Sequence, residues 1–278
     1  MPSPAVLITI AYFAVSVIFL STKRSRREFY CMMRPTSRIL VVLTVIISLS
    51  FIPRKNDIAG RTVPGVKTGC TARSFSSSLQ QACDLLYDSL QLGQAGLSEA
   101  ALEYAMKGYT YLQEKGRVSK NILSICDFSQ SSRNKRLYVI DMESRKLLYN
   151  TYVAHGRNSG SEFATSFSNT AESLKSSLGF YITQDTYVGS HGLSLKIEGM
   201  EKGFNDNAEK RNIVVHGCDY TSDPFVRSNS YCGRSFGCPA VPARQSSGII
   251  QTLKQGSCLF IYHPSASGYL NKSSILNS

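Results

Sequence analysis

Seven short apolar runs between Gly116 and the C-terminus constrain this chain more than any other feature. Each run is five to seven residues long, and glycine-containing or polar stretches separate them. Runs of this length, rich in β-branched and aromatic residues, are typical of strands. The runs are ILSICDF at 122–128, RLYVID at 136–141, LLYNTYV at 147–153, GFYIT at 179–183, LSLKI at 193–197, NIVVH at 212–216 and CLFIY at 258–262. We expect a mostly β (α+β) domain over 119–266 with a mainly antiparallel sheet, a hairpin at 142–146 and a C-terminal tail at 267–278.

Helical periodicity precedes these runs. Residues 78–92 and 98–115 are predicted to be helices, because apolar residues recur in them at helical spacing. Ser98 can cap the start of the second helix, and Gly116 can end it. The apolar positions of that helix are Leu102, Ala105, Met106, Tyr109 and Leu112. We expect a small helical accessory region over 77–118, packed on the β-rich domain.

Two uncharged apolar runs, at 5–20 and 39–52, mark the first 55 residues as a signal or membrane-anchor region. Each is shorter than the roughly 20 residues that span a bilayer comfortably. The stretch between them is strongly basic, so the positive-inside rule predicts that it stays in the cytoplasm and that residue 56 onward is exported. A start at Met32 or Met33 would instead leave a signal peptide. The sequence does not decide between cleavage and retention. Residues 56–76 are predicted to be a linker.

The formal net charge of +12 is concentrated at the N-terminus. Crowded beside apolar segments, such charge usually serves membrane topology, and the mildly basic remainder suits an anionic polymer. No nucleic-acid-binding motif is present, so we expect no nucleic-acid partner.

Of the eight cysteines, only Cys31 lies in the targeting region. In an oxidising compartment the other seven fit three disulfides plus one working thiol. Two local pairs are plausible, Cys70 with Cys83 and Cys218 with Cys232, although the alternative of buried, reduced thiols stays open.

The segment from 213 to 242 carries the chemistry. A β run ends in His216-Gly217, and a glycine-flanked turn then presents Cys238. An imidazole that accepts a thiol proton raises the fraction of attacking thiolate. The glycine before the cysteine lets the backbone N–H groups of Phe236, Gly237 and Cys238 converge on an oxyanion. We expect Cys238 to be the nucleophile and His216 its base.

These motifs resemble those of the murein L,D-transpeptidases, the YkuD-like cysteine transpeptidases of bacterial cell walls. The match consists of HG at 216–217, GRSFGCPA at 233–240 and upstream stretches such as RLYVIDM, YVAHGRNSG and LGFYIT. It runs from about Leu97 to Tyr262 and implies a β-rich catalytic domain of that type. Departures are Phe236 in place of a frequent His, Pro239 directly after the cysteine, and Ala240 where the family often carries Arg.

Further residues are candidates for substrate binding. Arg234 either takes over the role of the missing Arg, since a guanidinium pairs with carboxylates, or is an ordinary surface arginine. Ser235 belongs to the matched signature. His191 follows a β run beside a glycine, a setting that suits a loop lining a site. Weaker candidates are Arg157, Asn158, Tyr220 and His155, and His263 is expected to be structural.

The resemblance implies an enzyme that needs no metal or organic cofactor and acts on peptidoglycan stem peptides in the periplasm or cell envelope. Cys238 would form an acyl-thioester with a donor stem and pass it to an acceptor amine, making 3-3 or 1-3 crosslinks or anchoring a protein to the wall. The alternatives are an L,D-carboxypeptidase or endopeptidase, in which water resolves the thioester, and a catalytically silent wall-binding module. A zinc site of His216, Cys218, Cys232 and Cys238 is disfavoured, because the spacing lacks C-x2-C pairs.

Overall fold

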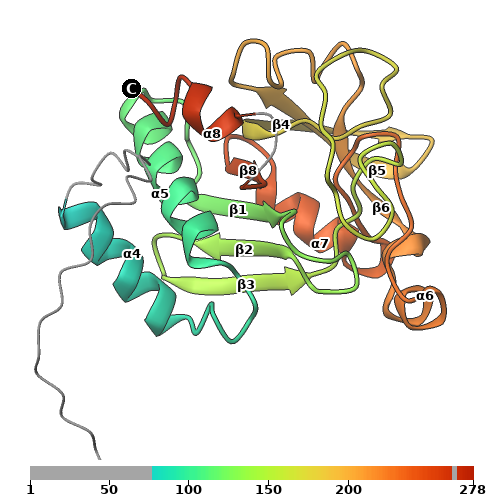
Figure 1. Ribbon diagram of the computed structural model, residues 1–278, viewed down its shortest axis with the longest axis horizontal. Helices are drawn as coiled ribbons and strands as arrows, with labels where there is room; N and C mark the ends of the chain where they lie inside the picture. The colour runs from blue at the N-terminus through green and yellow to red at the C-terminus, as the bar shows by residue number, and fades with distance from the viewer. Residues whose placement is uncertain (1–76, 265–267) are drawn as a thin grey trace, which may run out of the picture. The chain divides into compact units, whose positions relative to one another are not determined.

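Eight strands form one mixed sheet in the order β3-β2-β1-β8-β4-β5-β6-β7 (Figure 1). The structure is a computed structural model that describes residues 77–264 and 268–278. Within the sheet β1 pairs with β8 and β6 with β7 in parallel, and the other neighbours pair antiparallel. The strands are β1 (Ile122–Asp127), β2 (Leu137–Asp141), β3 (Lys146–Thr151), β4 (Gly179–Gly189), β5 (Gly192–Gly199), β6 (Val214–Cys218), β7 (Ala240–Pro242) and β8 (Cys258–Tyr262).

The predicted mostly β fold is therefore confirmed, including the hairpin between β2 and β3. Two strands extend beyond the ends that the sequence predicted. Strand β4 continues to Gly189, well beyond the predicted run. Strand β6 continues to Cys218, so His216 lies in the middle of a strand and not at its end. The short strand β7 directly after Cys238 was not predicted.

Helix α5 (Glu99–Glu114) confirms the predicted periodicity and anchors the helical region to the sheet. The Ser98 side chain accepts a hydrogen bond from the Ala101 N–H and caps the helix, as expected. The apolar face of α5 packs against β1 and β8. Gly108 allows this approach, because a Cβ there would lie 2.0 Å from the Phe180 ring. Helix α4 (Ser77–Ser89) contacts α5 and ends three residues earlier than predicted.

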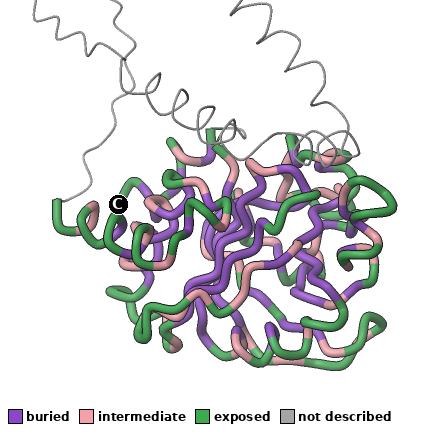
Figure 2. The backbone as a smooth tube through the Cα atoms, turned by 90° about the horizontal axis from the view of Figure 1, so that it is seen from below, coloured by how far each residue is buried: buried purple, intermediate pink, exposed green. Residues whose placement is uncertain are grey.

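The remaining helices flank the second half of the sheet. Helix α7 (Ala243–Leu253) packs against β5, β6 and β7. Between β6 and β7 the chain forms a 3-10 turn, η1 (Asp219–Thr221), and a short helix, α6 (Asp223–Asn229). The C-terminal segment forms α8 (Tyr269–Lys272), where the buried Tyr269 hydroxyl donates to Glu201. Figure 2 shows buried backbone through the interior strands and exposed backbone in the peripheral loops.

The expected disulfides are absent from the described residues. Cys83, Cys126, Cys218, Cys232, Cys238 and Cys258 are all free thiols. Strands β1 and β8 are neighbours, but Cys126 lies opposite Ile261 and Cys258 lies opposite Leu123, so the two thiols are out of register. The Cys218 sulfur contacts the Thr221 hydroxyl, at 3.1 Å. Cys31 and Cys70 lie outside the described residues.

The predicted apolar runs at 5–20 and 39–52 also lie outside the described residues. Among the residues that are described, no helix is both long enough and apolar enough to cross a bilayer.

Candidate active site

The turn before β7 presents Cys238 in a well-braced conformation. Gly237 has φ +129°, and a Cβ there would lie 2.8 Å from the Lys175 carbonyl oxygen. Glycine is the residue that tolerates both conditions. The Ser235 hydroxyl donates to the Cys238 carbonyl, at 2.6 Å, and accepts from the Gly237 N–H, at 3.1 Å. Ser235 therefore shapes the turn.

The half-buried Cys238 sulfur lies against the start of β6. It accepts from the Val214 N–H, with an N to S distance of 3.5 Å, and its thiol donates to the Asn212 carbonyl, at 3.6 Å. Burial raises the pKa of the Cys238 thiol above its ordinary value, and the Val214 N–H and the Arg211 guanidinium oppose that rise. The thiol is therefore protonated at rest.

His216 is held by strands on both sides of β6. It pairs with Ser194 of β5 and with Ala240 of β7, two residues beyond Cys238. Its Nδ1 lies 3.0 Å from the Gly217 carbonyl oxygen, so Nδ1 carries the proton and Nε2 keeps a free lone pair. Burial lowers the pKa of the His216 imidazole; the Gly217 bond opposes this, and nearby His191 adds to it. A neutral ring with a free Nε2 can act as a base.

The strand pairing between β6 and β7 brings His216 and Cys238 to the same part of the sheet. Within the described residues, however, no hydrogen bond joins the Cys238 sulfur to the His216 ring, since the sulfur contacts backbone atoms instead. Nucleophile-to-base hydrogen bonds are often loose without substrate and tighten when it binds.

His191 lies beside His216, as a residue lining the site would. It is exposed at the β4–β5 hairpin, and its ring stacks on the His216 ring at a centroid distance of 4.3 Å and an interplanar angle of 18°. His155, the other glycine-flanked candidate, is fully buried and belongs to a different cluster. Arg136 donates to His155 Nδ1, at 2.7 Å, and the ring Nε2 faces the Gly160 carbonyl.

Two candidate arginines flank the cysteine turn. The Arg157 guanidinium lies 5.9 Å from the centre of the exposed Phe236 ring, and the Arg157 N–H donates to the Ser235 carbonyl. Arg234 donates to the carbonyls of Gly160, at 3.3 Å, and Arg157, at 3.5 Å. Arg234 therefore braces the neighbouring loop in this structure.

Tyr220 and Asn158 hold loops near the site in place. The Tyr220 carbonyl accepts from the Gly233 N–H, at 2.7 Å, and a Cβ on Gly233 would meet the Tyr220 side chain at 2.6 Å. Tyr220 thus closes the base of the loop that contains α6. The Asn158 amide donates to the Ser173 carbonyl, which joins two loops near the site.

Of the three expected oxyanion donors, Gly237 is engaged elsewhere, because its N–H is bound by the Ser235 hydroxyl. Among the described residues the N–H groups of Phe236 and Cys238 donate to no other residue, and the Cys238 N–H faces its own sulfur. A developing oxyanion would therefore be met by these two groups.

Sequence reasoning missed two residues that build the site. The Ser176 hydroxyl donates to the Gly237 carbonyl, at 3.1 Å, and accepts from the Gly156 N–H. Arg211 donates to the carbonyls of Lys175, at 2.6 Å, and Ser168, at 2.8 Å. A serine in a polar loop carries no local signal, and the only hint at Arg211 is its place just before an apolar run.

No metal centre is formed in the part of the chain that the structure describes, where no three His, Cys, Asp or Glu side chains gather in a way that could hold an ion.

The structure thus combines a β-rich sheet with a braced cysteine turn that follows a histidine-bearing strand. A family model described as the L,D-transpeptidase catalytic domain matches residues 93–262. This is more than half of the chain, and the chain belongs to that family. The resemblance inferred from the sequence is thereby confirmed.

The solved structures that the chain matches include an L,D-transpeptidase from Mycobacterium smegmatis, at 10% identity and a TM-score of 0.32, covering 51% of this chain and 59% of that one. The L,D-transpeptidase LdtMt1 in complex with imipenem shares 11% identity, with a TM-score of 0.32 and the same coverage. A fused Zn-dependent amidase/peptidase/peptidoglycan-binding protein from Clostridium acetobutylicum shares 15% identity, with a TM-score of 0.31, and covers 55% of this chain and 61% of that one. This chain thus spans about three fifths of each of these structures. No curated protein matches it.

Proposed function

We propose that this protein is a peptidoglycan L,D-transpeptidase in which Cys238 forms an acyl-thioester with a donor stem peptide and His216 moves the protons. The observation that carries the proposal is the parallel pairing of β6 with β7, which holds the strand histidine beside the braced cysteine turn inside the family-matched region. The proposal requires the domain to face murein in the cell envelope, as the basic N-terminal loop predicts.

The protonation states support general-base chemistry rather than a preformed ion pair. Burial keeps the Cys238 thiol protonated by raising its pKa, and burial keeps the His216 ring neutral by lowering its pKa. A neutral imidazole with a free Nε2 can take the thiol proton as the sulfur attacks. The Cys238 sulfur would first leave its contacts with the backbone of Val214 and Asn212.

The proposed reaction has two balanced halves. In the first, the sulfur bonds to the carbonyl carbon at the L,D-configured bond of diaminopimelate, the amide C–N bond breaks, and the terminal D-amino acid leaves with the proton held by His216. In the second, an acceptor amine attacks the thioester carbonyl, the C–S bond breaks, and His216 returns the amine proton to the Cys238 sulfur. The N–H groups of Phe236 and Cys238 would stabilise each tetrahedral oxyanion.

The test incubates the full-length chain with disaccharide-tetrapeptide and follows both the intact protein mass and the muropeptide products. We expect an acyl adduct and crosslinked dimers with wild type and neither with Cys238→Ala. Cys232→Ala is the matched control, since it removes a buried thiol outside the turn. Tripeptide without dimers would assign the hydrolase activity instead, and an adduct that persists in Cys238→Ala would refute the nucleophile.

The role of His216 needs a variant that preserves the local structure. His216→Asn retains a side-chain N–H near the position of Nδ1, able to donate to the Gly217 carbonyl, and lacks Nε2. We expect its acylation rate to fall by about 100-fold or more, the usual contribution of a general base. An acylation rate equal to that of wild type would remove His216 from the proposal.

A further inference from the structure

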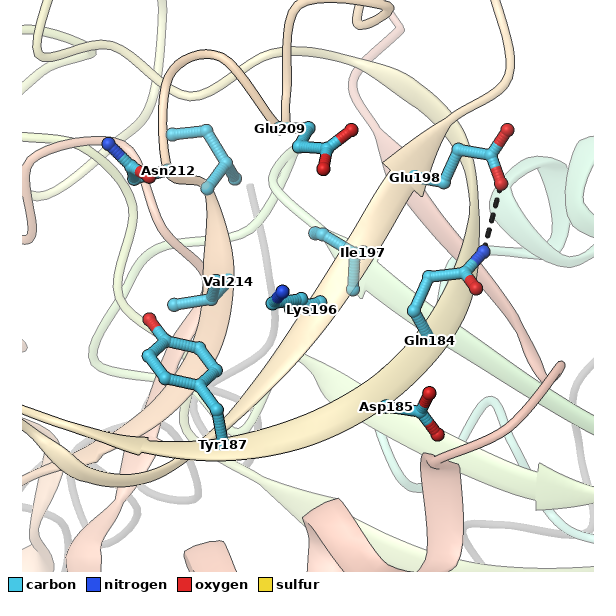
Figure 3. Close-up of a pocket in the computed structure, with 10 residues that line it drawn as sticks. Gln184, Asp185, Tyr187, Lys196, Ile197, Glu198, Glu209, Asn212 and Val214 are labelled. Atoms are coloured by element: carbon cyan, nitrogen blue, oxygen red, sulfur yellow. Dashed lines mark hydrogen bonds between the residues drawn. The ribbon is translucent and has the colours of Figure 1, made fainter.

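A cavity of about 690 Å³ adjoins the nucleophile and belongs to none of the roles assigned so far. Strands β4 and β5, the start of β6 and the segment before it, with Glu209, Asn212 and Ile213, form its walls (Figure 3). Its wall includes Asn212 and Val214, whose backbone groups contact the Cys238 sulfur. Two residues that contact the nucleophile sulfur thus also line this cavity.

The strand register places this cavity on the same sheet face as His216. Across β5 and β6, Lys196 lies opposite Val214 and Ser194 lies opposite His216. Residues two apart in a strand share a face, and residues directly opposite in neighbouring strands do too. Tyr187 of β4 lies opposite Ser194 and joins the same face. A ligand in the cavity would therefore lie on the same face of the sheet as His216, the proposed base.

Some charged side chains of the cavity have ion-pair or hydrogen-bond partners among the described residues, and others have none; the latter form what we call the open side. On one side Glu198 is satisfied, by an ion pair with Arg117 at 3.0 Å and a hydrogen bond from Gln184 at 2.9 Å. Figure 3 shows the hydrogen bond between Gln184 and Glu198, with Asp185 next to Gln184 and with Lys196 and Glu209 nearer the middle of the view.

Lys196 and Glu209 form the open side. The Lys196 ammonium lies 5.9 Å from the centre of the Tyr187 ring. Within the described residues, no ion pair or side-chain hydrogen bond engages the Lys196 ammonium or the Glu209 carboxylate. A cation and a carboxylate without ion pairs in a single cavity are complementary to a ligand that carries both charges. The Asp185 carboxylate, also in the wall, accepts a hydrogen bond from Gln255 at 3.5 Å.

We propose that this cavity binds the acceptor by its zwitterionic end, with Lys196 pairing the carboxylate next to the acceptor amine and Glu209 attracting the ammonium before it loses its proton. The inference rests on the proposed function, since it assigns the second substrate of the same site. It makes Lys196 and Glu209 determinants of acceptor specificity, distinct from the residues that form the thioester.

Equilibrium binding tests the inference without catalysis. Calorimetry on the full-length chain would compare a tripeptide that carries free diaminopimelate with the same peptide amidated at the side-chain carboxylate. We expect wild type to prefer the free acid by about tenfold, as for a partly exposed charge-assisted contact. Lys196→Met should remove the preference, and Lys196→Arg should keep it. The matched control Lys202→Met removes an exposed lysine outside the cavity wall and should change nothing.

The role of Glu209 is tested by the same calorimetry, with a peptide whose acceptor amine is acetylated. Glu209→Gln should abolish the preference of wild type for the free amine. Equal affinities of wild type and Lys196→Met for the acid and amide peptides would overturn the inference. Acylation of Cys238, followed separately by intact mass, tests the proposed function. If the chain binds the acid selectively but is never acylated, the transpeptidase assignment is refuted while the binding site stands.

Discussion

The buried pair of Arg136 and His155 makes the stability of this protein depend on pH in a calculable way. Both side chains are fully buried, and Arg136 also donates to the Val153 carbonyl, at 3.0 and 3.1 Å. Burial, followed by the Arg136 charge, lowers the pKa of His155 from 6.5 to about 3. Below pH 6.5 the unfolded chain therefore binds a proton that the folded chain excludes, and stability falls until the pH approaches 3.

The size of the effect follows from the width of this window. Each pH unit below 6.5 costs about 1.4 kcal/mol, so the His155 contribution lost by pH 5 is about 2 kcal/mol. His155→Asn places an amide oxygen near the Nδ1 position, where it can still accept from Arg136, and does not titrate. We expect this variant to be less stable than wild type at pH 7 and to lose about 2 kcal/mol less between pH 7 and pH 5.

Urea unfolding followed by far-UV circular dichroism at several pH values gives both stabilities. Comparing the two proteins at each pH cancels the contributions of other titrating groups. Parallel loss of stability in the two proteins between pH 7 and pH 5 would falsify the reasoning.

Three further outcomes are expected. Gly108→Ala should lower the free energy of unfolding by about 1–3 kcal/mol, because its Cβ would lie 2.0 Å from the Phe180 ring; an unchanged urea midpoint would contradict the packing described. Gly237→Ala should slow acylation of Cys238 by on the order of 100-fold with an unchanged circular dichroism spectrum, because φ is +129° and a backbone carbonyl lies 2.8 Å from the added Cβ. Arg211→Met should move the pH midpoint of iodoacetamide alkylation of Cys238 upward, because the guanidinium opposes the burial that raises the thiol pKa; a midpoint that stays or falls would refute this.

Most strands and the first two helices were predictable because their signals are local. Ser98 caps α5 and the apolar positions repeat at helical spacing, so pattern and structure agree. Helix α7 was not predicted: Ile249, Ile250 and Leu253 recur at helical spacing, but its sequence ARQSSGIIQTL also contains serines and a glycine, and no side chain caps its start. Packing against β5, β6 and β7 stabilises it, and that information is absent from the segment itself.

Helix α6 was missed although its signals are present. Ser222 caps it through the Phe225 N–H, and a proline lies in its first turn. The strand β7 is only three residues long and depends on pairing with β6 and the bridge to Ala154. A strand of that length has no detectable periodicity.

The residues of the candidate site were likewise predictable where their signal is local and not where it depends on tertiary packing. Cys238, His216 and the glycine before the cysteine were identifiable from chemistry and spacing. The stacking of His191 on His216 depends on the β4–β5 hairpin, and the contact of Arg211 with the 166–177 loop joins distant segments. Neither can be derived from local sequence, since both depend on tertiary packing.

The chain leaves the sheet after β6 and returns to it as the neighbouring strand β7, and this loop is closed at its base by the hydrogen bond from Gly233 to Tyr220. The cost of closing such a loop grows only slowly with its length. We therefore expect that α6 can be shortened, extended or exchanged without changing the β6–β7 register that relates His216 to Cys238. The segment is a natural position for inserting new recognition elements, whether by evolution within the family or by grafting in the laboratory.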